Sequence, residues 1–234
     1  MSQAYPLLLA AACFAGLVWL DRRMPAGFTR RLEAGPIIVA GGLAGARLGF
    51  VALRLPYFSA HPIEIAWLWQ GGLSWIGAAA GVLAVSALAA RMTGVSFWLL
   101  LDTLAVPAAL VSLAAWTGCL VDSCAWGRTV DWGPLGYDSL GNLARRWPTQ
   151  ALGMVLSGIL LAALLSLAGR SLASGLLGAG ALTLLAAVTT GLSLTRGDPS
   201  MLVGAWRIDT VAGVAVAMVA GAGATRRLAQ RASV

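Results

Sequence analysis

Long apolar stretches separated by short polar segments follow one another along nearly the whole chain. A membrane-spanning helix needs about 20 mostly apolar residues. The stretches that meet this requirement are residues 4–20, 35–53, 71–90, 96–120, 148–169, 172–194 and 201–224. The pattern therefore predicts an all-α integral membrane protein, a seven-transmembrane-helix bundle that forms a single polytopic membrane domain over residues 1–234.

The charges that flank these stretches indicate their orientation. No positive residue precedes the first stretch, whereas Asp21, Arg22 and Arg23 follow it, which is typical of an anchor with its N-terminus outside. Seven spans then place the C-terminus in the cytoplasm. The arginines of the cytoplasmic segments are Arg22, Arg23, Arg30, Arg31, Arg91, Arg170, Arg226, Arg227 and Arg231, and those outside are Arg54, Arg128, Arg145, Arg146 and Arg196. This cytoplasmic excess follows the positive-inside rule.

Two longer connections on the predicted outer side, residues 54–70 and 121–147, are expected to form a small outward-facing head. Eight of the ten tryptophans fall at or near this side: Trp67, Trp69, Trp75, Trp116, Trp126, Trp132, Trp147 and Trp206. A symmetric aromatic belt would divide them between both membrane surfaces. The head is therefore either a thick interfacial anchor or a structured cap at which amphipathic substrates meet the membrane.

Composition narrows the chemistry. Apolar residues make up 59% and charged residues 11%, which excludes an ordinary cytosolic enzyme and a disordered chain. All 16 basic residues are arginine and His61 is the only histidine, so lysine chemistry is excluded and neither a metal nor a cofactor is expected. His61 precedes Pro62 and is interpreted as an exposed loop residue. The net charge of +7 comes from arginines that flank apolar runs, so topology explains it better than nucleic acid.

Small residues recur at helical spacing in two of the spans. This spacing places them on one helix face, where they let neighbouring backbones approach closely in lipid. The two sets are Gly41, Gly45 and Gly49 in the second span, and Gly213, Ala217 and Gly221 in the last.

Arg47 lies inside the second span, away from the glycine face. An arginine in a span usually faces a partner or a polar cavity. One interpretation is a buried pair with Asp102, near the cytoplasmic end of the fourth span. The other is a cavity that takes a phospholipid headgroup, because a guanidinium group suits phosphate.

Polar and small residues interrupt the helical pattern over 115–128. Cys119 and Cys124 in this stretch, like Cys13, are interpreted as packing residues, with a redox-active 119/124 pair outside the cytoplasm as the alternative. The arginines of the outer connection 121–147 either contact lipid phosphates or belong to a solvated loop; they are Arg128, Arg145 and Arg146. Gln150 is expected at the membrane edge, in the first turn of a helix. Residues 196–199 are expected to form a turn. The side chains of Arg207 and Asp209 are expected to extend toward the membrane interface.

Taken in order, these motifs resemble the bacterial prolipoprotein diacylglyceryl transferase family over roughly residues 35–200. The residues that carry the resemblance are Gly45-Ala-Arg47-Leu-Gly49-Phe50-Val51, Tyr57, Pro62, Trp69-Gln70-Gly71-Gly72-Leu73-Ser74, Gly77, Asp102, Pro107, Gly118, Trp126-Gly127-Arg128, Pro148-Thr149-Gln150 and Arg196-Gly197-Asp198.

The resemblance implies a multi-pass enzyme of the bacterial inner membrane that moves the diacylglyceryl group of phosphatidylglycerol onto a lipobox cysteine of a prolipoprotein. It implies phosphatidylglycerol and a prolipoprotein as partners. The residues expected to bind the phospholipid headgroup are Arg47, Arg128 and Arg196. The residues expected to support them are Gly72, Ser74, Asp102, Gly118, Gln150 and Asp198.

The chain departs from the family pattern at several positions. The family's histidine position reads Ile76 and its key arginine position reads Trp116. The usual Tyr-Glu after the Pro-Thr-Gln motif reads Leu152-Gly153, and Thr189 and Ser193 stand in the late motif where the family has charged residues. No catalytic residue is assigned. The alternative function is therefore a catalytically inactive relative that binds phospholipid or an amphipathic or lipidated partner; a small-solute transporter is the weaker third hypothesis.

Overall fold

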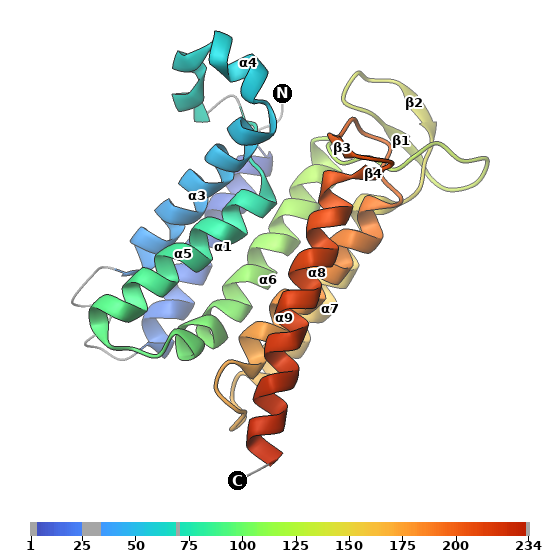
Figure 1. Cartoon of the computed structure of the whole chain (residues 1–234). Coiled ribbons are helices and arrows are strands. Elements are labelled where there is room, and N and C mark those ends of the chain that lie inside the picture. The colour runs from blue at the N-terminus through green and yellow to red at the C-terminus, as the bar shows by residue number, and fades with distance from the viewer. Residues whose placement is uncertain (1–3, 25–33, 69–70, 233–234) are drawn as a thin grey trace. The chain divides into compact units, whose positions relative to one another are not determined.

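The computed structural model describes residues 4–24, 34–68 and 71–232. Within them, seven helices are long and apolar enough to cross a membrane, as predicted (Figure 1). They are α1 (Ala4–Arg23), α3 (Ala34–Leu53), α5 (Trp75–Thr93), α6 (Phe97–Val121), α7 (Thr149–Leu167), α8 (Leu176–Ser193) and α9 (Ile208–Ala232).

The connections carry short regular elements. The segment 54–70 contains α4 (Leu55–Ala60) and the 3-10 helix η1 (Pro62–Ala66), while residues 69 and 70 lie outside the described part. An antiparallel hairpin of β1 (Leu135–Tyr137) and β2 (Leu143–Arg145) lies within 121–147. A second hairpin, β3 (Leu202–Val203) and β4 (Trp206–Arg207), precedes α9. The last span therefore begins at Ile208, whereas the apolar pattern placed its start at residue 201.

The chain divides into two compact units. Residues 21–100 form one, called here the middle unit, and residues 1–20 with 101–234 form the other, called here the terminal unit. The single domain expected from the sequence stays a prediction.

In the middle unit, α3 and α5 pack backbone against backbone. A Cβ atom added at Gly77 would lie 2.2 Å from the carbonyl oxygen of Gly45, and one added at Gly49 would lie 2.8 Å from Gly77 Cα. One added at Gly81 would lie 2.2 Å from the carbonyl oxygen of Gly41. The predicted glycine face of α3 is thus confirmed as a close-packing face. Its counterpart on α5, Gly77 and Gly81, shows the same four-residue spacing but was not predicted.

In the terminal unit, α6, α7 and α8 share an apolar core. Its buried side chains are Ala105, Val106, Ala109, Leu160, Leu164 and Ala181. Helix α9 packs on α8: a Cβ atom added at Gly213 would lie 2.2 Å from Oγ1 of Thr190, and one at Gly221 would lie 3.7 Å from Cγ2 of Thr183. The predicted small-residue face of the last span therefore meets α8 at both of its glycines.

Asp102 of α6 caps the N-terminus of α8. Its carboxylate oxygens accept hydrogen bonds from the amides of Gly175 at 2.6 Å and Gly178 at 2.8 Å. Gly175, at the N-cap position with φ of 88°, has no side chain of its own to accept these amides. A carboxylate also suits the positive end of the helix dipole. Both oxygens of Asp102 are engaged in this helix cap. That Asp102 pairs with Arg47, which belongs to the other unit, stays a prediction.

Candidate functional site

Arg47 in the middle unit binds main-chain carbonyl groups. Its Nε donates to Ile65 O at 2.8 Å, its Nη1 donates to Gly71 O at 2.8 Å and Gly72 O at 3.2 Å, and its Nη2 donates to Glu64 O. Four of the five N–H groups of the guanidinium are thereby used. Arg47 lies six residues before the end of α3, about 9 Å along the helix. Its side chain thus supplies hydrogen bonds to the carbonyl groups of irregular backbone at the membrane edge. Lipid cannot supply such hydrogen bonds.

Aromatic rings and two glycines complete the surroundings of Arg47. The guanidinium carbon lies 5.7 Å from the centroid of the Phe50 ring and 5.3 Å from that of Phe58. Gly71 and Gly72 have positive φ angles of 81° and 74°. A Cβ atom at Gly72 would lie 2.5 Å from the Phe50 ring and 2.9 Å from Nη1 of Arg47, so only glycine fits beside the cation.

Ser74 begins α5 directly after this turn. Its hydroxyl oxygen accepts from the amide of Gly77 at 3.4 Å, and its own amide donates to Ala46 O at 2.9 Å. Ser74 is therefore the N-cap of α5 and also ties that helix to α3. Gly72 and Ser74 thus shape the backbone beside Arg47. That they support a headgroup site stays a prediction.

The only histidine stacks on a tyrosine in the same connection. The rings of His61 and Tyr57 are 4.6 Å apart, and His61 Nδ1 lies 3.1 Å from Tyr57 O. A carbonyl oxygen only accepts, so Nδ1 carries the proton in this contact. Tyr57 donates its hydroxyl to Glu64 at 2.8 Å, and this hydrogen bond holds the pKa of Tyr57 above its usual value. His61 is exposed, as predicted.

Three backbone segments lie side by side at one end of the terminal unit: residues 126–130, 145–147 and 195–197. The amide of Arg128 donates to Thr195 O at 2.9 Å, and Arg128 O accepts from the amide of Trp147 at 3.0 Å. Gly127 allows this approach, because a Cβ atom there would lie 2.1 Å from Trp147 O. The backbone of Arg128 is therefore held from both sides.

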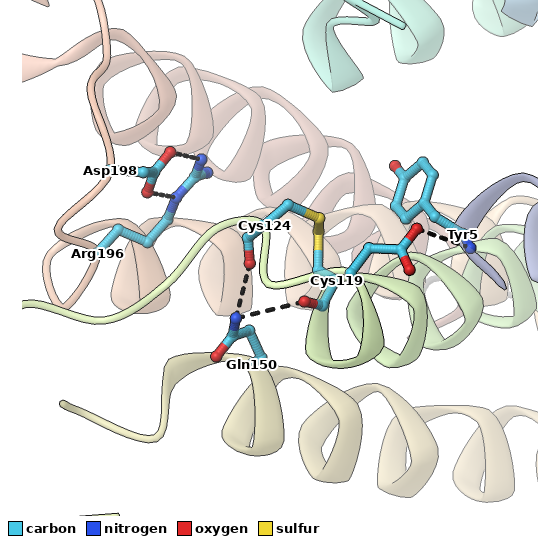
Figure 2. Close-up of a disulfide and its surroundings, with 7 residues drawn as sticks. Tyr5, Cys119, Cys124, Gln150, Arg196 and Asp198 are labelled. Atoms are coloured by element: carbon cyan, nitrogen blue, oxygen red, sulfur yellow. Dashed lines mark hydrogen bonds and ion pairs between the residues drawn. A yellow bond between two sulfur atoms is a disulfide. The ribbon is translucent and has the colours of Figure 1, made fainter. Parts of the chain in front are cut away.

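A disulfide joins Cys119 and Cys124 at the end of α6 (Figure 2). The interpretation of these two cysteines as packing residues is wrong. The side-chain amide of Gln150, in the first turn of α7, donates to Cys124 O at 2.8 Å and to Cys119 O at 3.3 Å. Ser123 and Ala125, with φ angles of 54° and 49°, have left-handed backbone that favours glycine. The turn is thus held by both a covalent bond and a side-chain bridge.

The disulfide turn also contacts α1. Asp122, inside the turn, accepts from the amide of Tyr5 at 3.2 Å, in the first turn of α1. A Cβ atom at Gly118 would lie 2.9 Å from Tyr5 Cα, so only glycine lets the two helices approach this closely. Gly118 and Gln150, predicted as supporting residues, therefore sit on either side of the same turn.

Arg196 is surrounded by carboxylates. It forms a two-point ion pair with Asp198, at 2.8 Å and 2.5 Å (Figure 2). A third contact joins it to Asp209 at 3.3 Å. Arg207 donates to the backbone oxygen of Asp198 at 2.6 Å and to its carboxylate at 3.3 Å. The expectation that Arg207 and Asp209 merely extend toward the interface is therefore wrong. Two arginines and two aspartates form a cluster with no net charge.

Burial acts on both arginines of this cluster. Burial lowers the pKa of Arg196, but the hydrogen bond and charge of Asp198, with the charge of Asp209, outweigh it and raise the pKa above its ordinary value. For Arg207, burial dominates and its pKa is lowered. Arg196 thus stays a fully charged partner of Asp198.

The remaining arginines at this end differ in exposure. Arg146 is 8% exposed and binds Asp138 at 3.1 Å. Arg145 donates to Gly133 O at 3.0 Å and is exposed. Arg128 is exposed as well, with its guanidinium carbon 5.9 Å from the centroid of the Trp147 ring. Among the described residues, no carboxylate lies within ion-pair distance of Arg128.

Two departures from the family pattern are in contact with each other. A Cβ atom at Gly153 of α7 would lie 2.2 Å from the Trp116 ring of α6. The indole therefore lies directly against the Gly153 backbone, in space that a side chain at residue 153 would need. Trp116 and Gly153 are a matched pair. The sequence alone does not reveal this contact, because the two positions are far apart along the chain.

The predicted headgroup arginines belong to different units. Arg128 and Arg196 are in the terminal unit, where Gly127 and Arg196 form a backbone bridge. Arg47 is in the middle unit. That all three bind one phosphate stays a prediction. Within the part of the chain that the structure describes, no group of three or more histidine, cysteine or acidic side chains is placed to hold a metal ion.

These features define a multi-pass membrane protein whose terminal unit carries a folded polar cap where α6, α7, α8 and α9 meet the connecting segments. The family model for prolipoprotein diacylglyceryl transferase matches residues 2–225. The chain therefore belongs to the prolipoprotein diacylglyceryl transferase family.

Several relatives are named phosphatidylglycerol–prolipoprotein diacylglyceryl transferase. The one from Bordetella avium (strain 197N) is 38% identical over 130 residues, which are 54% of this chain and 49% of the relative. The one from Nitrosospira multiformis (strain ATCC 25196 / NCIMB 11849 / C 71) is 32% identical over 160 residues, 65% of this chain and 54% of the relative. The chain thus spans about half the length of the curated relatives that it matches.

Proposed function

We propose that this protein transfers the diacylglyceryl group of phosphatidylglycerol to the cysteine thiol of a prolipoprotein. Its family membership supports this reaction, and the names of its relatives supply both substrates. The observation in this chain that carries the proposal is Arg128, an exposed cation on backbone held from both sides. Such a group suits a lipid phosphate at the membrane edge.

In this reaction the sulfur attacks the glyceryl carbon that bears the phosphate, and the thiol proton passes to the released glycerol phosphate or to water. The carbon–oxygen bond breaks, a thioether bond forms, and glycerol phosphate leaves with the electron pair of the broken bond. A positioned cation lowers the barrier by stabilising the charge that develops on the leaving group. We assign this direct contact to Arg128. Arg47 and Arg196 take positioning roles, because their guanidinium groups already bind protein oxygens.

The proposal predicts that the full chain restores lipoprotein modification in a bacterial strain depleted of its own transferase. Mass spectrometry of a model prolipoprotein should show the added diacylglyceryl mass. Arg128→Ala should lower the transfer rate about 100-fold, the scale of losing one group that stabilises transition-state charge. Arg170→Ala, an exposed arginine between α7 and α8, is the matched control and should leave the rate unchanged. An unmodified prolipoprotein despite verified membrane insertion of the wild-type chain would refute the activity.

A specific observation favours the second candidate function, a non-catalytic relative that binds phospholipid. The Trp116 ring lies against Gly153 where the family pattern has charged residues, and Ile76 stands at the family's histidine position. An apolar pair cannot hold a headgroup as charged side chains do. This candidate predicts no added mass in the same assay, together with a higher unfolding temperature when phosphatidylglycerol is added to the purified protein.

We also propose that the protein lies in the bacterial inner membrane with its N-terminus outside and its C-terminus in the cytoplasm. The arginine distribution along the chain supports this orientation. The disulfide at the end of α6 supports it independently, because disulfides persist in oxidising compartments outside the cytoplasm.

The orientation predicts how a single reactive cysteine responds to a membrane-impermeant maleimide in intact spheroplasts. In a Cys13→Ala background, Asp131→Cys, in the segment before β1, should react. Ser171→Cys, between α7 and α8, should react only after the membrane is permeabilised. Both native residues are exposed, so accessibility of the side chain itself does not differ between them. The opposite labelling pattern would show that the protein has the reverse orientation in the membrane.

A further inference from the structure

The β1–β2 hairpin of the terminal unit presents an apolar face to its surroundings. In its register, Leu135 pairs with Arg145 and Tyr137 pairs with Leu143, so these four side chains share one side of the hairpin. The exposed fractions are 63% for Leu135, 56% for Tyr137 and 52% for Leu143, and Leu140 at the turn is 84% exposed. Neighbouring exposed apolar side chains of this kind indicate a surface that binds something.

This face is rigidly built. The Asp138 carboxylate accepts from the amides of Leu140 and Asn142, both at 2.9 Å, and from the side-chain amide of Asn142 at 3.0 Å. The buried Arg146 adds an ion pair to Asp138 at 3.1 Å and a hydrogen bond to Gly136 O at 3.3 Å. The apolar side chains therefore cannot withdraw into the protein by collapse of the turn.

The hairpin lies within reach of the membrane surface. Arg146, at its base, is three residues before Thr149, where α7 begins. Three residues extend at most about 10 Å. The headgroup region outside the hydrocarbon core is itself only several ångströms thick on each side. The base of the hairpin is thus held near headgroup level by the covalent chain.

The side chains around this face identify the occupant. Arg145 and Arg128 are exposed cations, and the Trp132 and Trp147 rings meet edge to face at 4.8 Å. Arginine, tyrosine and tryptophan beside leucine are the composition of an interfacial anchor, and cations favour an anionic surface. We propose that the β1–β2 hairpin inserts its apolar face into the anionic phospholipid leaflet at the end of the protein's own helices. This proposal does not depend on transferase activity.

A depth measurement tests the proposal. Leu140→Cys in a Cys13→Ala background leaves one reactive thiol, because Cys119 and Cys124 are joined to each other. A fluorophore on residue 140 would be followed in the full-length protein reconstituted into vesicles that contain phosphatidylglycerol. We expect lipids with a quencher near the headgroup to lower its fluorescence and iodide in the water to have little effect. A label on Ser171→Cys should instead respond to iodide.

Two outcomes would overturn the proposal. The first is a label on residue 140 that iodide quenches and lipid quenchers do not. The second is a label that becomes shielded from iodide only after an apolar peptide is added, which would assign the face to a polypeptide. The variant Arg145→Gln tests whether the positive charge contributes. It should reduce quenching of the residue-140 label by lipid quenchers in phosphatidylglycerol vesicles. Equal lipid quenching with and without Arg145 would overturn the claim that the hairpin binds an anionic leaflet through this cation.

Discussion

Gly77→Ala should strongly destabilise the pairing of α3 and α5. The added methyl carbon would lie 2.2 Å from the carbonyl oxygen of Gly45 and 2.9 Å from Gly49 Cα. Both neighbours are backbone atoms, which no change of rotamer can move aside. We expect a loss of about 3 kcal/mol or more in the free energy of unfolding, at the upper end of overpacking effects. Thermal unfolding of the purified protein in detergent micelles would measure it.

Gly191→Ala is the matched control for this change. Gly191 is a helical glycine of α8, with open space where a Cβ atom would be placed. Alanine is the better helix former, so this variant should be as stable as the wild type or more stable by up to about 1 kcal/mol. If Gly77→Ala unfolded at the same temperature as Gly191→Ala, the close approach of α3 and α5 would be refuted.

Arg47→Met should release the turn that precedes α5. Methionine fills a similar volume but donates no hydrogen bond, so the carbonyl groups of Glu64, Ile65, Gly71 and Gly72 would lose a charged donor. We expect a cost of about 3–5 kcal/mol, the scale of removing one partner from a buried charged contact. Arg47→Lys should cost less, since an ammonium group replaces part of the donor set. Hydrogen exchange over residues 62–68 and thermal unfolding would report the change.

Arg54→Met provides the comparison for Arg47. Arg54 is exposed and lies with its guanidinium carbon 4.1 Å from the centroid of the Phe50 ring. Loss of an exposed cation–ring contact should cost no more than about 1 kcal/mol. Equal stability of the two methionine variants would contradict the positioning role of Arg47. A phospholipid-dependent rise in unfolding temperature that persists in Arg47→Met, which has no cation, would argue that Arg47 does not contact the headgroup directly.

The spans and their close-packing faces could be predicted because they depend on local patterns. Gly45 and Gly49 mark a face simply by their spacing. Gly77 and Gly81 carried the same signal and could have been found in the same way. The hairpin before α9 was missed because residues 201–207 are apolar enough to extend the last span, while its turn at Gly204, with φ of 62°, is visible only in the backbone.

The candidate site was only partly predictable. The sequence identifies Arg128 and Arg196 as cations of the outer connections. It does not show that Arg196 is paired with carboxylates whereas Arg128 is exposed. Asp209 approaches Arg196 from the start of α9, thirteen residues away in the chain, and adds a second carboxylate to the one that Asp198 supplies. The Cys119–Cys124 disulfide could have been inferred from two cysteines in an outer segment, whereas the bridge from Gln150 depends on how α7 meets α6.

The sequence by itself determined that this is a seven-span membrane protein, because the length and apolarity of a segment decide whether it can remain in lipid. It also determined the family, through short motifs in a set order. Only the tertiary structure decided which charges remain available. Arg47 is taken up by carbonyl groups and Arg196 by carboxylates, while Arg128 stays exposed. The physical reason is that the partner of a charge is chosen by proximity in space, and proximity between distant segments exists only after the helices have packed.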